Sequence, residues 1–312
     1  VVNTGLLQAN ITNKNNLGGA LVAYLAGGGG VYGSYSSGSN SSVGSIRGLG
    51  LGGLVGFNVS STIQNCWSSV SVISSNATFF SGGLVAYMGG AGASVANSYA
   101  SGPVIVLGSA SSYVGGLVGY AVTNSVIRDS YATGFVSGTN IANTTGLATG
   151  ATSTNAYWNS DTSGNSNGVG IGLHTTQLQG TLNKLNSSNW GVAPGQYPYQ
   201  KYLFPQGLQS VSGTAYRADS TTANTSSAAS IVVNLTLNGL AQPKVVAGAN
   251  GYYYAALPIS IASDGTTLYP ISSTGTNVLA WTDANGAYSS NAYNLNNFSS
   301  ASAGFNIGGS SG

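Results

Sequence analysis

Two aspartates of this chain, Asp129 and Asp161, are separated by one period of the internal repeat described below. If neighbouring copies of a repeat brought the two carboxyl groups together, one could act as acid and the other as base in glycoside hydrolysis. However, Asp129 takes the position that Asn65 and Asn97 hold in two earlier copies. An amide from Asn97 could donate to the Asp129 carboxylate and complete a polar ladder, so we expect Asp129 to be structural.

Three further features have residue types that occur in functional sites. His174 is the single histidine and has no acid close to it in sequence, so it predicts neither a metal site nor a catalytic triad. The stretch NSDTSGNSNG around Asp161 resembles a calcium loop but holds one acid, where several charged oxygens are needed. GLGLGG at residues 48–53 fits a dinucleotide motif, yet neither a helix nor an acid follows it. We therefore predict no catalytic, cofactor-binding or metal-binding residue, and no enzyme.

The composition excludes several classes of partner. Charged residues make up 4% of the chain, against about 25% in an ordinary globular domain, and the net charge of +2 comes from scattered side chains. This charge pattern argues against nucleic acid or anionic lipid as a partner. With 42% hydrophobic residues and 19 tyrosines the chain should fold. The longest apolar stretch, residues 17–31, is too short and too rich in glycine to span a membrane.

Nine asparagines lie in Asn-X-Ser/Thr sequons, the acceptor pattern for N-glycosylation. Roughly eight such sequons would arise by chance in a chain so rich in Asn, Ser and Thr, so their number does not by itself indicate a glycoprotein. The candidate positions are Asn10, Asn40, Asn58, Asn76, Asn143, Asn186, Asn224, Asn234 and Asn297.

Two short phrases alternate along the first half of the chain. One reads G-G-L-V-[GA]-[YF] and begins at residues 52, 82 and 115, with a variant at residues 18–24. The other reads [VI]-x-N-S-Y-A-x-G, and its columns recur with a period of about 32 residues. A degraded fifth copy covers residues 145–159. The columns are an apolar one (Val31, Ile63, Val95 and Ile127), a polar one (Gly33, Asn65, Asn97 and Asp129) and an aromatic one (Tyr35, Trp67, Tyr99 and Tyr131).

The second phrase alternates like a β-strand, with Val95, Asn97 and Tyr99 on one face, which we expect to point inward. One copy buries too little apolar surface to offset an ordering entropy of about 1–2 kcal/mol per residue. Stacked copies would pair their backbones about 4.8 Å apart. We therefore predict an all-β protein in which residues 1–180 form a parallel β-solenoid, a right-handed β-helix of about five repeats. Whether one repeat makes one wide coil or two short ones stays open.

Two columns carry further expectations. The face opposite the aromatic column holds a mixed set, which predicts exposure to solvent: Tyr32, Gln64, Ala96 and Arg128. Cys66, the single cysteine, takes the position of Ser34, Ser98 and Ser130, so we expect a small residue that fills a small site.

The phrase GGLVGY is apolar or bare on both faces, which is typical of a strand covered on both sides. Its glycines permit tight bends or a close approach of backbones. We therefore expect another layer, or a neighbouring subunit, to cover the outer face of this strand, and exposure of Val55, Val85 and Val118 would refute that expectation.

The composition changes after Gln179. Residues 181–206 concentrate proline and tyrosine and predict a packed connector. Residues 207–312 alternate like strands separated by turns, which predicts an antiparallel, Ig-like β-sandwich. Within it, Tyr252–Tyr254 could form a binding patch, yet alternation buries at least one of the three, so strand packing is the better interpretation.

The pair GGLVGY…IRDSYATG resembles the GLUG motif of large bacterial surface proteins, especially filamentous-haemagglutinin-like adhesins. The segment NAYWNSDTSGNSNGVGIGLHTTQLQG at residues 155–180 is similar to the segment that commonly ends GLUG arrays. The stretches VSGT, NLTLNG and ANGYYY are similar to β-sandwich modules of surface proteins and to the tails of these adhesins. The resemblance implies an exported, β-helical adhesive protein without catalysis. Because the family's N-terminal secretion domain is not recognisable here, we expect a C-terminal portion or a differently exported relative.

These observations predict an exported structural protein, extracellular, on the cell surface or secreted. We expect a subunit of an extracellular filament or a surface adhesin that joins copies of itself head-to-tail, with host or environmental surface glycans as further partners. The N-terminal stretch VVNTGLLQANIT could add a strand to the sandwich of a neighbour. Two alternatives stay open: a carbohydrate-active β-helix enzyme, and a monomeric glycan-binding module that uses exposed Tyr and Trp.

Overall fold

The computed structural model describes most of the first two thirds of the chain and parts of the last third. The described residues are 1–13, 17–42, 50–74, 79–107, 112–138, 143–205, 207–214, 232–237, 240–241, 245–258, 278–282 and 304–308. They belong to two compact units. The first comprises Val1–His174 and Lys184–Asn186, and the second comprises Thr175–Asn183 and Ser187–Gly312. Most of the residues expected to form a connector, 181–206, thus belong to the second unit.

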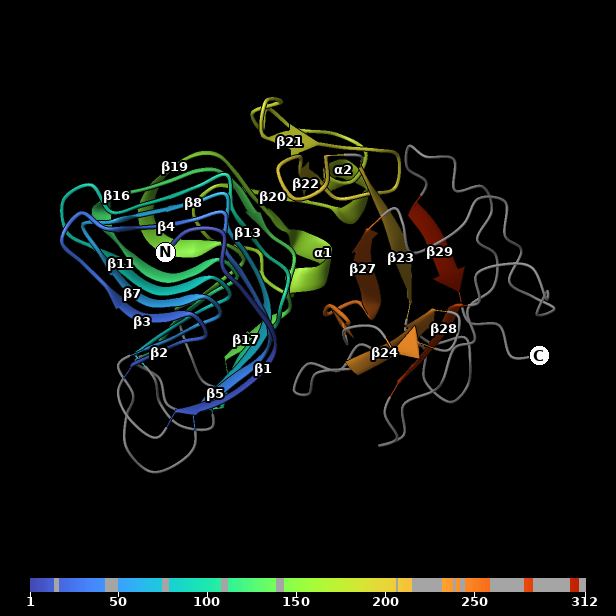
Figure 1. The fold of residues 1–312 in the computed structure, drawn as a ribbon, viewed down its shortest axis with the longest axis horizontal. Helices are drawn as coiled ribbons and strands as arrows, with labels where there is room; N and C mark the ends of the chain where they lie inside the picture. The colour runs from blue at the N-terminus through green and yellow to red at the C-terminus, as the bar shows by residue number, and fades with distance from the viewer. Residues whose placement is uncertain are drawn as a thin grey trace. The chain divides into compact units, whose positions relative to one another are not determined.

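The first unit is a parallel β-solenoid, in which each copy of the repeat makes one coil (Figure 1). The register shows this directly: Val31 pairs with Ile63, Ile63 with Val95 and Val95 with Ile127, each one period further along the chain. The strands of this part are β4 (Gly30–Tyr32), β8 (Thr62–Gln64), β12 (Ser94–Ala96) and the long β16 (Val118–Ala132). The prediction of an all-β fold with a parallel solenoid is confirmed, and one repeat makes one wide coil.

The aromatic column lies on the next stretch of each coil, after a corner. Its strands pair in parallel: β1 (Gly5–Asn13), β5 (Tyr35–Ser42), β9 (Trp67–Ser74), β13 (Tyr99–Ala100), the end of β16 and β19 (Ala148–Asn159). β14 (Val104–Val106) continues the fourth coil and β17 (Val136–Gly138) the fifth.

The corner explains why the polar column is made of Gly, Asn and Asp. Asn65, Asn97 and Asp129 have φ of 55°, 46° and 47°, in the left-handed region that these residue types tolerate best. The chain turns there, so the alternation changes phase. Ala100 then enters the core and Tyr99 is half-buried on the outer face. The expectation that the aromatic column points inward together with Val95 was therefore wrong, because strict alternation does not continue through a left-handed residue.

The column that was expected to face solvent, opposite the aromatic column, is exposed only in part. Tyr32 and Arg128 are exposed and Gln64 is half-buried, whereas Ala96 is fully buried. The short Ala96 side chain is covered although its column faces outward.

The GGLV phrase makes a second sharp bend. A Cβ on Gly83 would collide with the carbonyl oxygen of Gly116 on the next coil, so the backbones approach too closely for any side chain. Leu84 and Val85, which follow the bend, are both fully buried in the main core. Alternation is therefore interrupted here as well. The strands that follow this bend are β3 (Val22–Leu25), β7 (Val55–Val59), β11 (Val85–Gly89) and the start of β16.

Another layer covers the outer face of these strands. A Cβ on Gly119 of β16 would meet the backbone of Ser81, and a Cβ on Gly50 would lie 2.9 Å from the Cβ of Ala86. Ser81 and Gly50 belong to a five-stranded parallel sheet made by the residues before the bend. This sheet comprises β18 (Asn143–Thr145), β15 (Tyr113–Gly115), β10 (Phe80–Gly82), β6 (Gly50–Gly52) and β2 (Leu17–Gly19). The cover expected from the bare outer face comes from the same chain.

The last coil is shorter than the others. Tyr131 pairs with Tyr157, which follows it by less than one full period, so the column position of Asp129 passes to Asn155. After β19 the chain forms one helical turn, α1 (Ser160–Ser163), and then β20 (Ile171–Leu173), which pairs in parallel with the end of β19.

The second unit contains small, mainly antiparallel sheets. After α2 (Thr175–Leu178), β21 (Trp190–Gly191) pairs with β22 (Tyr199–Gln200). One further sheet joins β23 (Leu208–Thr214) to β27 (Tyr252–Pro258) and, in parallel, to β29 (Gly304–Gly308). The other joins β24 (Val232–Leu237) to β25 (Leu240–Ala241), β26 (Val245–Val246) and β28 (Val278–Thr282). Tyr253 is 1% exposed between half-buried Tyr252 and Tyr254, so alternation buries one of the three tyrosines, as expected.

No helix among the described residues is long and apolar enough to cross a bilayer.

Candidate functional site

The aromatic column forms a continuous stack of rings along the solenoid, here called the aromatic ladder (Tyr35, Trp67, Tyr99 and Tyr131). Successive ring centroids are 4.9, 6.0 and 5.2 Å apart, and the interplanar angles are 3°, 11° and 7°. Burial raises the pKa of Tyr99, which has a ring on either side. Because the inner rings use their faces on one another, they offer sugars no free face on which to stack.

A second aromatic row follows the last position of the GGLV phrase. Tyr24 stacks on Phe57 at 6.3 Å, Phe57 on Tyr87 at 4.8 Å and Tyr87 on Tyr120 at 6.1 Å. Phe80 packs against the row from the covering layer, with its ring 5.1 Å from that of Tyr87. Tyr24, in the first coil, is 56% exposed, which makes it the most exposed ring of either row. The sequence signal for this row is the [YF] position that ends the G-G-L-V-[GA]-[YF] phrase. The three columns defined above belong to the second phrase and do not include this position.

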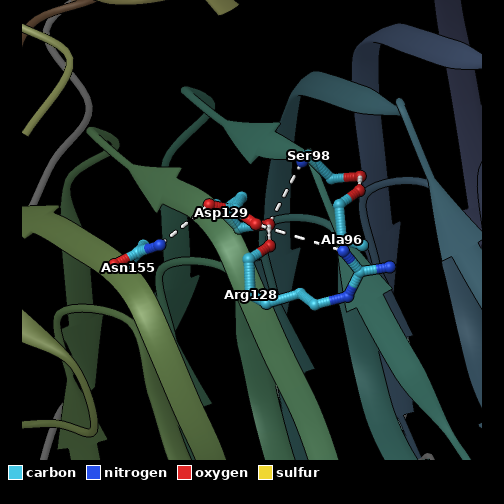
Figure 2. A network of polar contacts seen from close by, with 6 residues as sticks. Ala96, Ser98, Arg128, Asp129 and Asn155 are labelled. Atoms are coloured by element: carbon cyan, nitrogen blue, oxygen red, sulfur yellow. Dashed lines mark hydrogen bonds and ion pairs between the residues drawn. The ribbon is translucent and has the colours of Figure 1, made fainter. Parts of the chain in front are cut away.

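The carboxylate of Asp129 is held inside the polar column (Figure 2). The Asn155 amide of the next coil donates to its Oδ1 at 3.1 Å, and the Arg128 guanidinium lies 4.0 Å from its Oδ2. This contact comes from the following coil, and the donation expected from Asn97 of the preceding coil stays a prediction. A carboxylate with these partners stabilises the corner of the coil.

A ladder of small polar side chains lies next to the polar column. The Ser130 hydroxyl donates to the Arg128 carbonyl at 2.7 Å and accepts from the Ser98 amide at 3.1 Å, and the Ser98 hydroxyl repeats the pattern on Ala96 (Figure 2). Cys66 continues this ladder in the neighbouring coil, where its amide donates to the Ser98 hydroxyl at 3.1 Å. Each coil is thereby joined to the next by a side chain as well as by its backbone.

Cys66 is a structural thiol. Its side chain is fully buried, and its Sγ lies 3.2 Å from the carbonyl oxygen of Gln64. Burial raises the pKa of the thiol from 9.0 to about 11, although backbone hydrogen bonds act in the opposite direction. The thiolate is the reactive form of cysteine, so this raised pKa makes Cys66 a poor nucleophile at neutral pH.

Asp161 and His174 meet at the end of the solenoid. Asp161 lies in the first turn of α1, which the Asn159 side chain caps by accepting from the amides of Asp161 and Thr162. His174 Nδ1 lies 2.6 Å from Asp161 Oδ1, and their side chains are 66% and 29% exposed. The sequence did not predict this pair, because the stretch between the two residues is aperiodic.

The paired carboxylates of the enzyme hypothesis are not neighbours in the polar column. The column position next to Asp129 belongs to Asn155, because the last coil is shortened, and Asp161 lies beyond it on α1. Within the described residues, no group of three or more His, Cys, Asp or Glu side chains could hold a metal ion. The separation of the two aspartates by one repeat period thus did not predict their placement.

The sequons differ in accessibility. Asn58 is fully buried and its amide donates to the Ser94 carbonyl at 3.4 Å, so it cannot accept a glycan in the folded chain, contrary to the expectation. Asn10 and Asn186 are exposed, and Asn143 is half-buried. Asn40 and Asn234 lie on strands β5 and β24, with side chains outside the described set, and three sequons lie outside the described residues altogether: Asn76, Asn224 and Asn297.

Comparison with known proteins gives one motif and one distant structure. A solved structure named IgA1 Protease is 22% identical over 48% of this chain and 12% of that one, with a TM-score of 0.40, a similarity too low to support an argument. No curated protein matches. The family model described as the GLUG motif matches residues 110–137, which contain the fourth GGLV phrase and the strand that follows it. The motif and the β-helix fit a surface or secreted protein, and this chain is a β-solenoid that carries the GLUG motif.

Proposed function

We propose that this chain is an exported structural protein, without catalytic activity, that serves as a rigid adhesive rod outside the cell. The observation that carries the proposal is that side chains with reactive groups form contacts between successive coils. The Asp129 carboxylate accepts from Asn155 of the next coil, and the Cys66 thiol donates to the Val31 carbonyl of the preceding coil. The Ser130 hydroxyl likewise accepts from an amide of the preceding coil. Side chains that are consumed in coil-to-coil contacts support a scaffold better than they support an active site.

The finer proposal is a subunit of a filament or a surface adhesin whose partners are copies of itself and surface glycans. The scarcity of charge supports self-association, because few like charges would oppose contact between copies. The first coil also presents apolar side chains: Val2, Leu7 and Tyr24 are 62%, 61% and 56% exposed. Head-to-tail growth would join this coil of one copy to the sheets of the second unit of the next copy, rather than to the last coil of its solenoid.

The location is tested by immunogold labelling of intact producing cells with antibodies against the solenoid. We expect label on the cell exterior or on material outside it, and label restricted to the cell interior would overturn the proposal. Negative-stain images of the purified chain at rising concentration then test self-association. Filaments or regular oligomers are expected, and dispersed monomers at every concentration would remove the filament from the proposal.

A glycan-binding module is the second candidate, and the exposure of Tyr24 favours it. A tyrosine at the end of a row keeps one ring face for a sugar, with its hydroxyl as a polar handle. Binding on a glycan array that Tyr24→Ala abolishes would support this candidate. Tyr202→Ala is the matched control, since Tyr202 is 54% exposed in the second unit and belongs to neither row.

A further inference from the structure

We propose that residues 159–173, here called the end segment, are a built-in stop that occupies the place of a further coil and so blocks stacking of a second copy on this end of the solenoid. The inference rests on the proposed function, since it concerns how a self-associating rod is limited. A parallel solenoid offers unpaired N–H and C=O groups at an end, which can pair with another chain unless they are covered. The end segment covers them on several sides of the last coil.

On the side of the aromatic ladder, the end segment supplies a strand. β20 pairs with β19 in parallel, with Tyr157 opposite Ile171 and Trp158 opposite Gly172. A further coil would pair with β19 in the same direction. The site for it is thus already filled, by the short strand β20.

On the side of the GGLV bend, the end segment bonds without a strand. The Gly146 amide donates to the Asn167 carbonyl at 2.9 Å, and the Val169 amide donates to the Ala148 carbonyl at 3.1 Å. In the inner coils these positions bond to the next coil, as when the Gly116 amide donates to the Thr145 carbonyl at 3.2 Å. Val169 also packs against the main core, so the segment covers apolar surface as well.

Past the aromatic ladder, side chains complete the cover. The Thr162 hydroxyl donates to the Thr133 carbonyl at 2.7 Å, and the Asn165 amide donates to the Val136 carbonyl at 3.0 Å. In the inner coils the corresponding carbonyls accept from backbone amides of the next coil, as when the Ala100 carbonyl accepts from the Thr133 amide at 2.9 Å. The end segment thus replaces backbone donors by side-chain donors.

The outer side of the end segment cannot act as a template in turn. α1 satisfies its first amides through the Asn159 cap and ends at Gly164 with φ of 73°, and Gly168 and Gly170 also have positive φ. A chain with these bends has no long strand edge, in contrast to β1 in the first coil, which is 9 residues long. The contact between Asp161 and His174 fastens the last residue of the solenoid to α1.

The test compares the full chain with variants that loosen the end segment. Asn159→Ala removes the α1 cap, and Asn165→Ala removes the bond to the Val136 carbonyl. At a concentration at which the wild-type chain is still dispersed, we expect the double variant to form end-to-end chains of solenoids in negative-stain images, and its mass by sedimentation velocity to rise at least twofold over the wild-type chain. Ser130→Ala is the matched control, because it removes a ladder bond between inner coils and leaves the end segment intact; its mass should stay at the wild-type value.

A gentler variant guards against misfolding of the double variant. His174→Ala removes only a 66% exposed partner of Asp161, so the β-sheet circular dichroism signal should persist. The mass should rise above the wild-type value, as it does for the double variant. Hydrogen exchange at the amides of Gly146 and Val169 reports whether the segment has opened. Faster exchange at these amides with an unchanged mass would overturn the inference and leave the proposed surface function standing. Failure to find the chain outside the cell would instead remove the proposed function, whatever these variants do.

Discussion

The inner coils and the end segment satisfy the same kinds of backbone group by different means. In an inner coil the partner is the next copy of the repeat, in register, as Val95 pairs with both Ile63 and Ile127. At the end, a shortened coil, one helical turn and a short strand complete the bonds with side-chain donors and caps. Repetition therefore makes the coils stable collectively, whereas the end depends on individual residues.

This difference predicts how each region responds to substitution. A change in an inner coil disturbs the contact with two neighbours and should lower the free energy of unfolding of the whole solenoid. A change in the end segment should act locally. The following substitutions are ordered from the largest expected effect to the smallest.

Gly116→Ala should be the most damaging. The new Cβ would collide with the carbonyl oxygen of Gly146 on the next coil, and backbone cannot move aside without breaking the ladder. We expect a loss of about 4 kcal/mol or more in the free energy of unfolding, measured by denaturant titration. The control is Gly29→Ala, whose Cβ would meet nothing closer than 3.4 Å, so that an equal loss there would contradict the explanation.

Alkaline pH should destabilise the chain through Cys66. The pKa of the thiol is raised from 9.0 to about 11 by burial, so the folded state keeps its proton where the unfolded state loses it. The contribution of this thiol to the free energy of unfolding is fully present below pH 9. It falls by about 2–3 kcal/mol as the pH rises from 9 to 11. Cys66→Ser, which restores the residue of the other coils, should reduce the fall between pH 9 and 11 by that amount. An unchanged pH profile would show that Cys66 is not buried as described.

The corner of the coil can be tested at Asn97. Its φ of 46° is unfavourable for Ala, so Asn97→Ala should lower the free energy of unfolding by about 1–2 kcal/mol. Asn97→Gly should be tolerated better, because Gly33 already occupies this position in an earlier coil with φ of 55°. If both substitutions had the same effect on the urea midpoint, the contacts of the Asn97 side chain would matter more than its backbone conformation.

Asp161→Asn should have the smallest global effect. It weakens a partly exposed contact with His174, and such pairs contribute about 0.2–1 kcal/mol. Its consequence should appear locally, as faster hydrogen exchange of amides in the end segment with little change in those of β8 and β12. Uniformly faster exchange throughout the solenoid would contradict the separation between the two regions.

The coils could be predicted well from the sequence because they repeat. The even spacing of the apolar column from Val31 to Ile127 predicted the register, and the serine column correctly predicted a small buried site for Cys66. The facing of Tyr99 was not predictable from alternation alone, because the left-handed corner at Asn97 shifts the phase.

The aperiodic parts were harder to predict for the same reason. The shortened last coil places Asn155 beside Asp129, and only the folded chain brings Asp161 to His174. Where a segment has no counterpart in another copy of the repeat, its residue types alone do not predict where its side chains lie in the fold. The candidate reactive groups of this chain therefore had to be located in the structure before their roles could be inferred.

The stacking of coils in register is the central claim, and a metal-bridge measurement tests it most directly. Tyr32 and Gln64 pair across the first two full coils with outward side chains, so Tyr32→His with Gln64→His should place two imidazoles within reach of one Ni²⁺ ion. At a Ni²⁺ concentration of about 100 times the dissociation constant, the free energy of unfolding should rise by about 2.7 kcal/mol. The out-of-register pair Tyr32→His with Thr62→His should gain much less. Equal gains for both pairs, or none for the first, would contradict the solenoid register.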